Sequence, residues 1–166
     1  GSGESPYQSI YASSGNPMMI DLEKLVQEKL LEESELSVCR MPQDGKVHFE
    51  ELEPRKTDLL RKAYSRFDTS QVYFKEFAKG NFRDYGLFMA LREKNGGKPF
   101  WEWPKRYRDH DVTELEIFYR KNLDEVNFWL FLQYEFFRQW KELKAYVNGL
   151  GIKIIGDIPL YMAYDS

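Results

Sequence analysis

The sequence is poor in the residues that build disulfide bonds and metal sites. It contains one cysteine, Cys39, and two histidines, His48 and His110. A single cysteine excludes an internal disulfide and fits a reducing compartment, so we expect a cytoplasmic protein. The histidines are far apart and neither has ligand-like spacing to Cys39, so the sequence predicts no metal site.

Long apolar runs and an excess of positive charge are also lacking. The longest apolar-rich run, 128–137, is interrupted by Gln133 and Glu135 and is well below the roughly 20 residues that span a bilayer. The 24 basic and 27 acidic residues are interspersed and give a net charge of −3. We therefore expect a soluble protein without a signal peptide, and neither a membrane nor a nucleic acid as partner.

Familiar catalytic motifs are absent as well. Gly96-Gly97 is better interpreted as a helix stop than as a phosphate-binding loop, and no serine or cysteine nucleophile motif is present. The carboxylate pairs Glu32-Glu33 and Glu50-Glu51 lie in charge-rich stretches, which is typical of solvated faces.

What the chain does have is aromatic residues, which make up 16% of its 166 positions. Such content indicates an aromatic core or a surface that stacks on flat ligand faces, and we favour the core. Helical spacing places Trp129 and Trp140 in that core. For Trp101 and Trp103, in a short segment closed by Pro104, both structure and sugar stacking stay open.

Helical periodicity dominates after the first twenty residues. Asp21 is the expected N-cap of a first helix. Four further helical stretches are bounded by capping or breaking residues: one with Pro54 in its first turn, one over 72–79, one from Asn81 or Asp84 to Gly96-Gly97, and one over 112–150 that Asn122-Leu123-Asp124 could divide.

The end of the chain changes period. A nearly continuous β-branched run over 152–158 has the pattern of a buried parallel strand. A parallel strand needs neighbours, yet residues 1–151 hold no second run of this quality. A complete (β/α)8 barrel needs about 250 residues, so we infer a piece of a larger α/β protein.

Asp157 lies at the carboxyl end of this expected strand and is followed by Ile158 and Pro159. In α/β barrels that end of a strand carries the active site. The residue pattern alone fits a functional carboxylate and a strand-terminating cap equally well.

Three blocks of sequence, in order, resemble the 4-α-glucanotransferases, also known as amylomaltase or disproportionating enzyme. The resemblance covers about residues 4–166. The blocks are Ser5-Pro6-Tyr7-Gln8 with Gly15-Asn16-Pro17, then 84–91 with Gly96-Gly97 and Trp101-Glu102-Trp103-Pro104, and last 136–146 continuing through 151–161.

The resemblance implies a mostly α chain, consisting of a helical insertion subdomain plus one or two strands of a (β/α)8 TIM barrel. It assigns 1–20 to a cleft-lining loop, 21–110 to the helical insertion, and 111–166 to a long helical segment and an early barrel strand. The implied activity is retaining transfer of α-1,4-glucan segments between maltooligosaccharides, without a cofactor.

The family's catalytic carboxylates lie on later strands, so the resemblance implies that none is in this chain and that the isolated chain is inactive. It implies that Ser5, Tyr7 and Gln8 line the glucan cleft, with Tyr7 contacting sugar near the scissile bond. Asp157 would support the sugar site. Gly86 departs from the family, which often has a small residue with a side chain there.

A different class of function stays open from the residues alone. The chain could be a standalone helical module that uses exposed aromatic side chains to bind glucan or to assemble with a protein. Self-association is a related expectation, because the run near Ile154 and the surfaces that would meet a barrel would be exposed.

Overall fold

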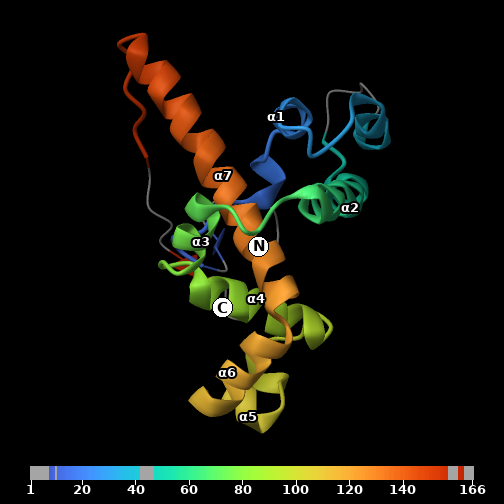
Figure 1. The fold of residues 1–166 in the computed structure, drawn as a ribbon, viewed down its shortest axis with the longest axis vertical. Coiled ribbons are helices and arrows are strands. Elements are labelled where there is room, and N and C mark those ends of the chain that lie inside the picture. Colours follow the sequence, from blue (N-terminus) through green and yellow to red (C-terminus); the bar gives the residue numbers. More distant parts are fainter. Residues whose placement is uncertain (1–7, 10, 42–46, 157–160, 163–166) are drawn as a thin grey trace.

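The computed structural model describes residues 8–9, 11–41, 47–156 and 161–162, and these form a mostly helical fold, as the sequence predicts (Figure 1). The elements follow in the order β1 (Gln8–Ser9), η1 (Pro17–Met19), α1 (Leu22–Gln27), η2 (Glu33–Cys39), α2 (Phe49–Arg66), α3 (Val72–Ala78), α4 (Arg83–Lys94), η3 (Phe100–Glu102), α5 (Lys105–Arg108), α6 (Val112–Lys121), α7 (Leu123–Gly149) and β2 (Tyr161–Met162).

Helix α7 is the axis of the molecule. Its 27 residues span about 40 Å, and α2, α3, α4 and α6 pack around its first half (Figure 1). Four consecutive residues, 130–133, are all buried, so this half of the helix is covered on several sides, as its apolar pattern predicts. Gly86 brings α4 close, since a Cβ there would lie 3.0 Å from Leu130.

The aromatic residues concentrate in the core. The ring of Phe67 lies 5.2 Å from Phe74 and 4.9 Å from Phe131, joining α2, α3 and α7. Tyr134 adds contacts with Phe74 at 5.6 Å. These tilted and edge-on pairs stabilise the packing beyond the apolar area they bury, which confirms that the core takes much of the aromatic content.

Capping residues define several helix ends as expected. The carboxylate of Asp21 accepts from the amide of Glu23 at 2.9 Å at the start of α1. Gly96 and Gly97 follow α4 with φ of 67° and 75°, a conformation that favours glycine. The division of 112–150 is confirmed, because α6 ends at Lys121 and the side chain of Asn122 donates to the carbonyl of Phe118.

The second helix begins earlier than predicted. Helix α2 starts at Phe49, so Pro54 lies inside it and the prediction that Pro54 occupies the first turn is wrong. Two acidic residues, Glu50 and Glu51, occupy the first turn, where negative charge is favourable. The amide of Leu52 already donates to the carbonyl of His48 at 2.9 Å.

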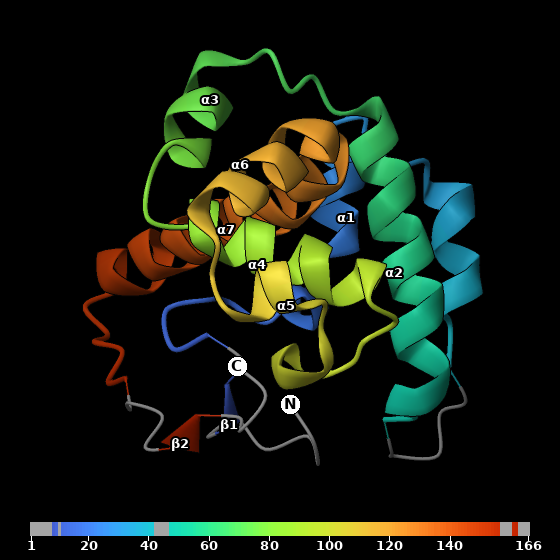
Figure 2. The same ribbon diagram turned by 90° about the horizontal axis from the view of Figure 1, so that it is seen from below.

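The predicted strand over 152–158 is wrong for 152–156, which form no strand; residues 157 and 158 lie outside the described part. The run is exposed, and Ile155 is 93% accessible. A β-branched run needs a neighbouring sheet to bury it, and no described element offers one. Strand structure among the described residues is limited to β1 and β2, which pair in parallel over two residues (Figure 2).

Candidate functional site

The described ends of the two predicted sugar-binding segments meet at the β1–β2 pair. Gln8 is opposite Tyr161 and Ser9 is opposite Met162. Ser5, Tyr7 and Asp157 lie outside the described residues, and Gln8 is described only through its backbone. The pair therefore sets the chain directly after Tyr7 beside the chain that follows Asp157.

Gly15 fixes the other end of this N-terminal segment to α7. The side-chain oxygen of Gln133 accepts from the amide of Gly15 at 2.8 Å, and its Nε2 donates to the carbonyl of Gly15 at 3.0 Å. A Cβ at Gly15 would lie 2.0 Å from the ring of Phe136, so only glycine lets the backbone approach this closely.

Tyr11 holds the middle of the segment against α4. Its ring lies 5.6 Å from that of Tyr85 and 6.5 Å from that of Phe82. The amide and the hydroxyl of Ser14 both donate to the carbonyl of Tyr11, which closes a turn. Nε2 of Gln133 also donates to the hydroxyl of Tyr85 at 3.2 Å, and burial raises the pKa of Tyr85 to about 12.

The chain after Gly15 continues along α7 in the same direction. Three polar contacts along this path join residues that are 118 positions apart in the sequence, so the two segments advance together. The contacts are Gly15 with Gln133, the main chain of Asp21 with Gln139 at 2.8 and 3.2 Å, and Lys24 with Glu142 at 2.7 Å.

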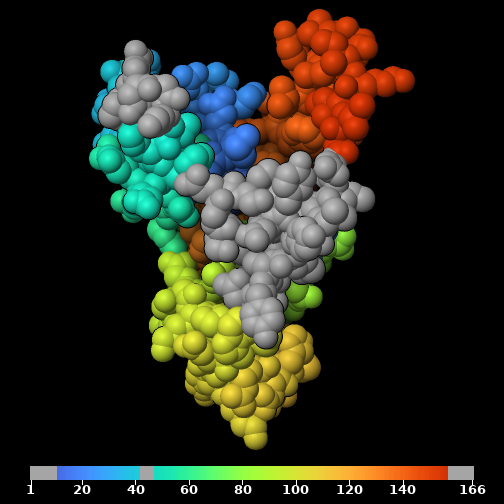
Figure 3. Space-filling model, turned by 180° about the vertical axis from the view of Figure 1, so that it is seen from behind, coloured from blue at the N-terminus to red at the C-terminus, as the bar shows by residue number. Residues whose placement is uncertain are grey.

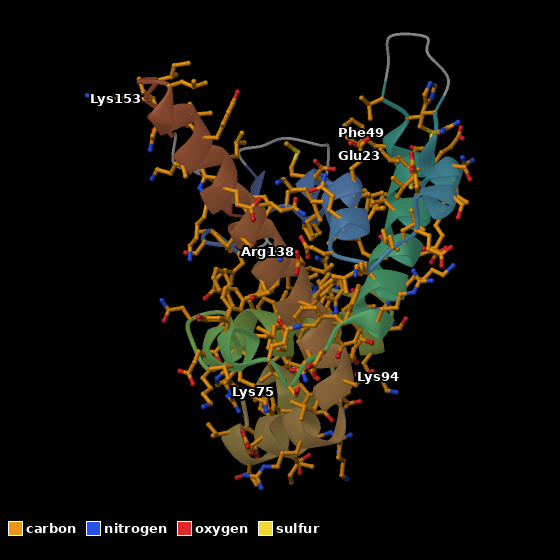
Figure 4. All side chains as sticks on the ribbon, turned by 45° about the horizontal axis from the view of Figure 1, so that its top comes forward. Glu23, Phe49, Lys75, Lys94, Arg138 and Lys153 are labelled. Carbon is orange, nitrogen blue, oxygen red and sulfur yellow. The ribbon has the colours of Figure 1, made fainter. Side chains whose placement is uncertain are left out.

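A partly buried charge cluster lies between the end of α1 and α7. Figure 4 labels Arg138 midway along α7, and its guanidinium pairs with Glu28 and, at 2.6 Å, with the fully buried Glu135. Burial, with Glu142 nearby, raises the pKa of Glu135 to about 7. Arg138 binds only one oxygen of this carboxyl group, and the buried Oε1 has no hydrogen-bond partner among the described residues, which disfavours the ionised form.

The tryptophans separate into buried and exposed ones. Trp103 is 5% exposed and its Nε1 donates to the carbonyl of Lys98 at 2.8 Å, which favours the structural alternative. Trp101 is 39% exposed beside Phe100, so it presents aromatic surface to solvent. Trp129 packs against the core as predicted, but Trp140 is 37% exposed, and its prediction as a core residue is wrong.

A second polar group bridges three helices away from this segment. Arg61 of α2 pairs with Glu125 of α7 at 2.9 Å and with Glu93 of α4 at 2.5 Å. It borders an open hollow of about 370 Å³, where the hydroxyl of Tyr64 donates to Asp124 at 2.9 Å. Since these charged and polar groups bind one another, we interpret the arrangement as one that stabilises the contact between the helices.

The carboxylate pairs Glu32-Glu33 and Glu50-Glu51 are exposed, as predicted. Within the described part of the chain, no three histidine, cysteine or acidic side chains come together in a way that could hold a metal ion. None of its helices is both long enough and apolar enough to cross a membrane.

The anchoring glutamines were not singled out from the sequence, although a signal was present. Gln133 interrupts an otherwise apolar run, and a polar side chain at such a position must find partners when the helix is covered. Which partners it finds depends on contacts across 118 residues, which periodicity does not show.

Comparison with known proteins gives matches along the whole chain. The pattern of one protein family, described as 4-alpha-glucanotransferase, matches residues 1–166. The 4-alpha-glucanotransferase of Clostridium butyricum is 41% identical over 169 residues, covering 99% of this chain and 35% of that protein. That of Thermus thermophilus is 38% identical over 174 residues, covering 100% and 34%.

A solved structure has the same fold as this chain. Amylomaltase from Streptococcus agalactiae, in complex with acarbose, superposes with a TM-score of 0.88 at 31% identity, covering 98% of this chain and 34% of that one. The chain thus spans about a third of the length of the relatives it matches.

Proposed function

This chain belongs to the 4-alpha-glucanotransferase family, as its three sequence blocks indicated, and we propose that it is one segment of an enzyme that transfers α-1,4-glucan segments between maltooligosaccharides. The observation that carries the proposal is the match over residues 1–166, together with a TM-score of 0.88 to an amylomaltase. That amylomaltase was solved with acarbose, which supports glucan binding by the whole protein.

The proposed transfer is a retaining reaction in two steps. A carboxylate attacks the anomeric carbon of the donor and the glycosidic C–O bond breaks, while a second carboxyl group protonates the departing sugar oxygen. The hydroxyl of an acceptor sugar then gives its proton to that second group, attacks the anomeric carbon and releases the first carboxylate. We place these carboxylates outside this chain, whose isolated form would then be inactive, and we propose no cofactor.

Within this chain, we propose that Ser5, Tyr7, Gln8 and Asp157 bind the glucan. The β1–β2 pair supports this assignment, because it joins the backbone at Gln8 to the segment that follows Asp157. Trp101, which is 39% exposed, is a further candidate for sugar stacking.

We propose that residues 1–20 line the cleft, 21–110 form the helical insertion, and 111–166 lead into a (β/α)8 barrel. The exposed far end of α7 supports the proposal that another part of the enzyme covers it, because no residue of α7 beyond Gln139 is buried (Figure 3). An apolar stripe recurs at helical spacing, with exposed side chains at Trp140, Leu143, Tyr146 and Leu150. The remainder of the enzyme would cover it, and without that remainder the chain would self-associate.

We also propose a cytoplasmic location, because a chain with the single cysteine Cys39 fits a reducing compartment.

The test is a transfer assay on the full-length protein that contains this chain. With maltotriose as the sole substrate, we expect glucose together with maltopentaose and longer products. Glucose and maltose alone would indicate hydrolysis and would overturn the proposal. The isolated chain, incubated in parallel, should leave maltotriose unchanged.

The exposed Trp101 favours one alternative, a standalone module that binds glucan or assembles with a protein. Calorimetric titration of the isolated chain with maltoheptaose distinguishes a standalone glucan-binding module from a segment that binds glucan only within the whole enzyme. Heat of binding that is lost in Trp101→Ala and Tyr7→Ala but kept in a Trp140→Ala control would support glucan binding by the module. Absence of heat would count against glucan binding by the isolated chain.

A further inference from the structure

We propose that Gln133 is a positioning residue for glucan binding: it holds the main chain of Gly15 against α7 and so fixes the described segment 11–15, which begins four positions after Tyr7 in the sequence. The inference rests on the proposed function, in which Tyr7 contacts the sugar. Gln133 itself need not touch substrate.

The side chain of Gln133 is fully buried and its hydrogen-bonding groups are matched one by one. Oε1 accepts from the amide of Gly15 at 2.8 Å, while Nε2 donates to the carbonyl of Gly15 at 3.0 Å and to the hydroxyl of Tyr85 at 3.2 Å. Both N–H donors and the carbonyl are thus used. The side chain therefore selects one orientation and one distance for the backbone at Gly15.

The contact also requires a glycine at position 15. A Cβ would lie 2.0 to 2.3 Å from three ring atoms of Phe136, so a side chain would push the backbone away from α7. Gly15 and Gln133 therefore form a matched pair, in which one permits the close approach and the other holds it.

The described segment 11–15 is held by contacts with α4 and α7. It lacks regular secondary structure over 11–15, apart from the turn closed by Ser14 on Tyr11. Its described attachments include the β1–β2 pair, the packing of the Tyr11 ring on α4, the hydrogen bond from the Tyr11 hydroxyl to the carbonyl of Asn81 at 3.4 Å, and Gln133. Loss of the last attachment would widen the positions open to Tyr7, and binding geometry is sensitive to shifts of about 1 Å.

The chain offers a matched control in Gln139. This residue makes the same kind of contact, from the same helix, with the main chain of Asp21 at 2.8 and 3.2 Å. Asp21 caps α1, farther from Tyr7 than Gly15 is in the sequence. Loss of Gln139 should therefore cost stability without disturbing the glucan-binding segment.

The experiment compares Gln133→Met and Gln139→Met in the full-length protein, since methionine keeps the size and removes the hydrogen bonds. We expect Gln133→Met to raise the KM for maltotriose about tenfold with a smaller change in kcat, and Gln139→Met to leave KM within about twofold of the parent. Gly15→Ala, which keeps Gln133, should reproduce the rise in KM. Equal KM values in Gln133→Met, Gly15→Ala and Gln139→Met would overturn the inference.

Hydrogen–deuterium exchange of the full-length variants gives a readout that does not depend on activity. In Gln133→Met, amides of the segment 11–15 should exchange faster than in the parent, whereas in Gln139→Met they should not. Unchanged exchange in Gln133→Met overturns the anchoring itself. If the parent shows no transfer but the exchange result holds, then the proposed function fails while the anchor stands.

Discussion

Three polar side chains lie inside the covered half of α7, where burial is costly unless each finds a partner. The side-chain amides of Gln133 and Gln139 form hydrogen bonds with the main chain of Gly15 and Asp21 in the N-terminal segment. Glu135 instead shares the guanidinium of Arg138 with Glu28, and one of its oxygens has no partner among the residues that the structure describes. At the scale of single residues, α7 thus specifies the path of the segment 15–24 by polar contacts.

The charge cluster leads to a prediction about pH. Burial raises the pKa of Glu135 from 4.5 to about 7, so the folded chain holds this proton more tightly than the unfolded chain does. The contribution of Glu135 to the free energy of unfolding is therefore fully present below pH 4.5 and declines as the pH rises through 7. Glu135→Gln should remove this decline. The free energy of unfolding of the variant, relative to that of the parent, should therefore be higher at pH 8 than at pH 5.

Urea unfolding of both proteins at several pH values between 4 and 8 measures this difference. The other charges of the cluster are Arg138, Glu28, Glu142 and Lys24, and both proteins retain them. A constant difference in the free energy of unfolding across this range would show that folding does not raise the pKa of Glu135.

Gly86 leads to a prediction about packing. A Cβ there would lie 3.0 Å from Leu130 and 3.2 Å from Val126, so Gly86→Leu should overpack the α4–α7 contact. We expect a loss of about 1–3 kcal/mol in the free energy of unfolding, measured in urea. Gly149→Leu is the control, because no atom lies within 4 Å of a Cβ at that position. Equal stabilities of the two variants would contradict close packing at Gly86.

At the scale of elements, helix boundaries were predictable where a side chain or a glycine marks them. Asp21, the break at Asn122 and the Gly96-Gly97 stop are local signals, and the structure has all three. The 3-10 helix η2 was not predicted, since its seven residues lack the 3.6-residue period by which an α-helix is recognised in a sequence. Its start depends on Glu35, whose carboxylate accepts from the amide of Glu32.

The strand prediction shows where local signals are insufficient. The β-branched run that begins at Ile152 has the composition of a buried strand, but strand formation requires a partner that the described residues do not provide. The candidate site has the same limit. Tyr7 and Asp157 came from the family resemblance, whereas Gln133 and Gly15 became visible only through contacts between distant segments.

The cap of α6 leads to a prediction at this scale. The carboxylate of Asp111 accepts from the amides of Thr113 and Glu114 at 3.0 and 3.1 Å. Asp111→Ala should lower the free energy of unfolding by about 1 kcal/mol, whereas Asp111→Asn should retain most of the stabilisation that the cap provides. Asp109→Ala is the control, because Asp109 is exposed and pairs with Arg108. Equal losses in Asp109→Ala and Asp111→Ala, measured in urea, would refute the capping role.

At the scale of the whole molecule, the far end of α7 projects from the rest of the fold, and none of its residues beyond Gln139 is buried (Figure 3). We expect the isolated chain to associate through its apolar stripe at Trp140, Leu143, Tyr146 and Leu150. Light scattering should show a mass that rises with concentration, and Leu143→Glu or Tyr146→Glu should return it to that of a monomer. Tyr73→Glu on α3, where Tyr73 is 80% exposed, is the matched control and should change nothing. A monomeric parent at high concentration would contradict this.

The central claim is that these 166 residues form part of a glucan-transferring enzyme whose catalytic carboxylates lie elsewhere in the protein. The most direct measurement follows the products from maltotriose for the full-length protein and for the isolated chain, side by side. We predict glucose and a ladder of longer maltooligosaccharides from the full-length protein, and unchanged maltotriose from the chain. Transfer by the isolated chain at a comparable rate, or no longer products from the full-length protein, would contradict the account.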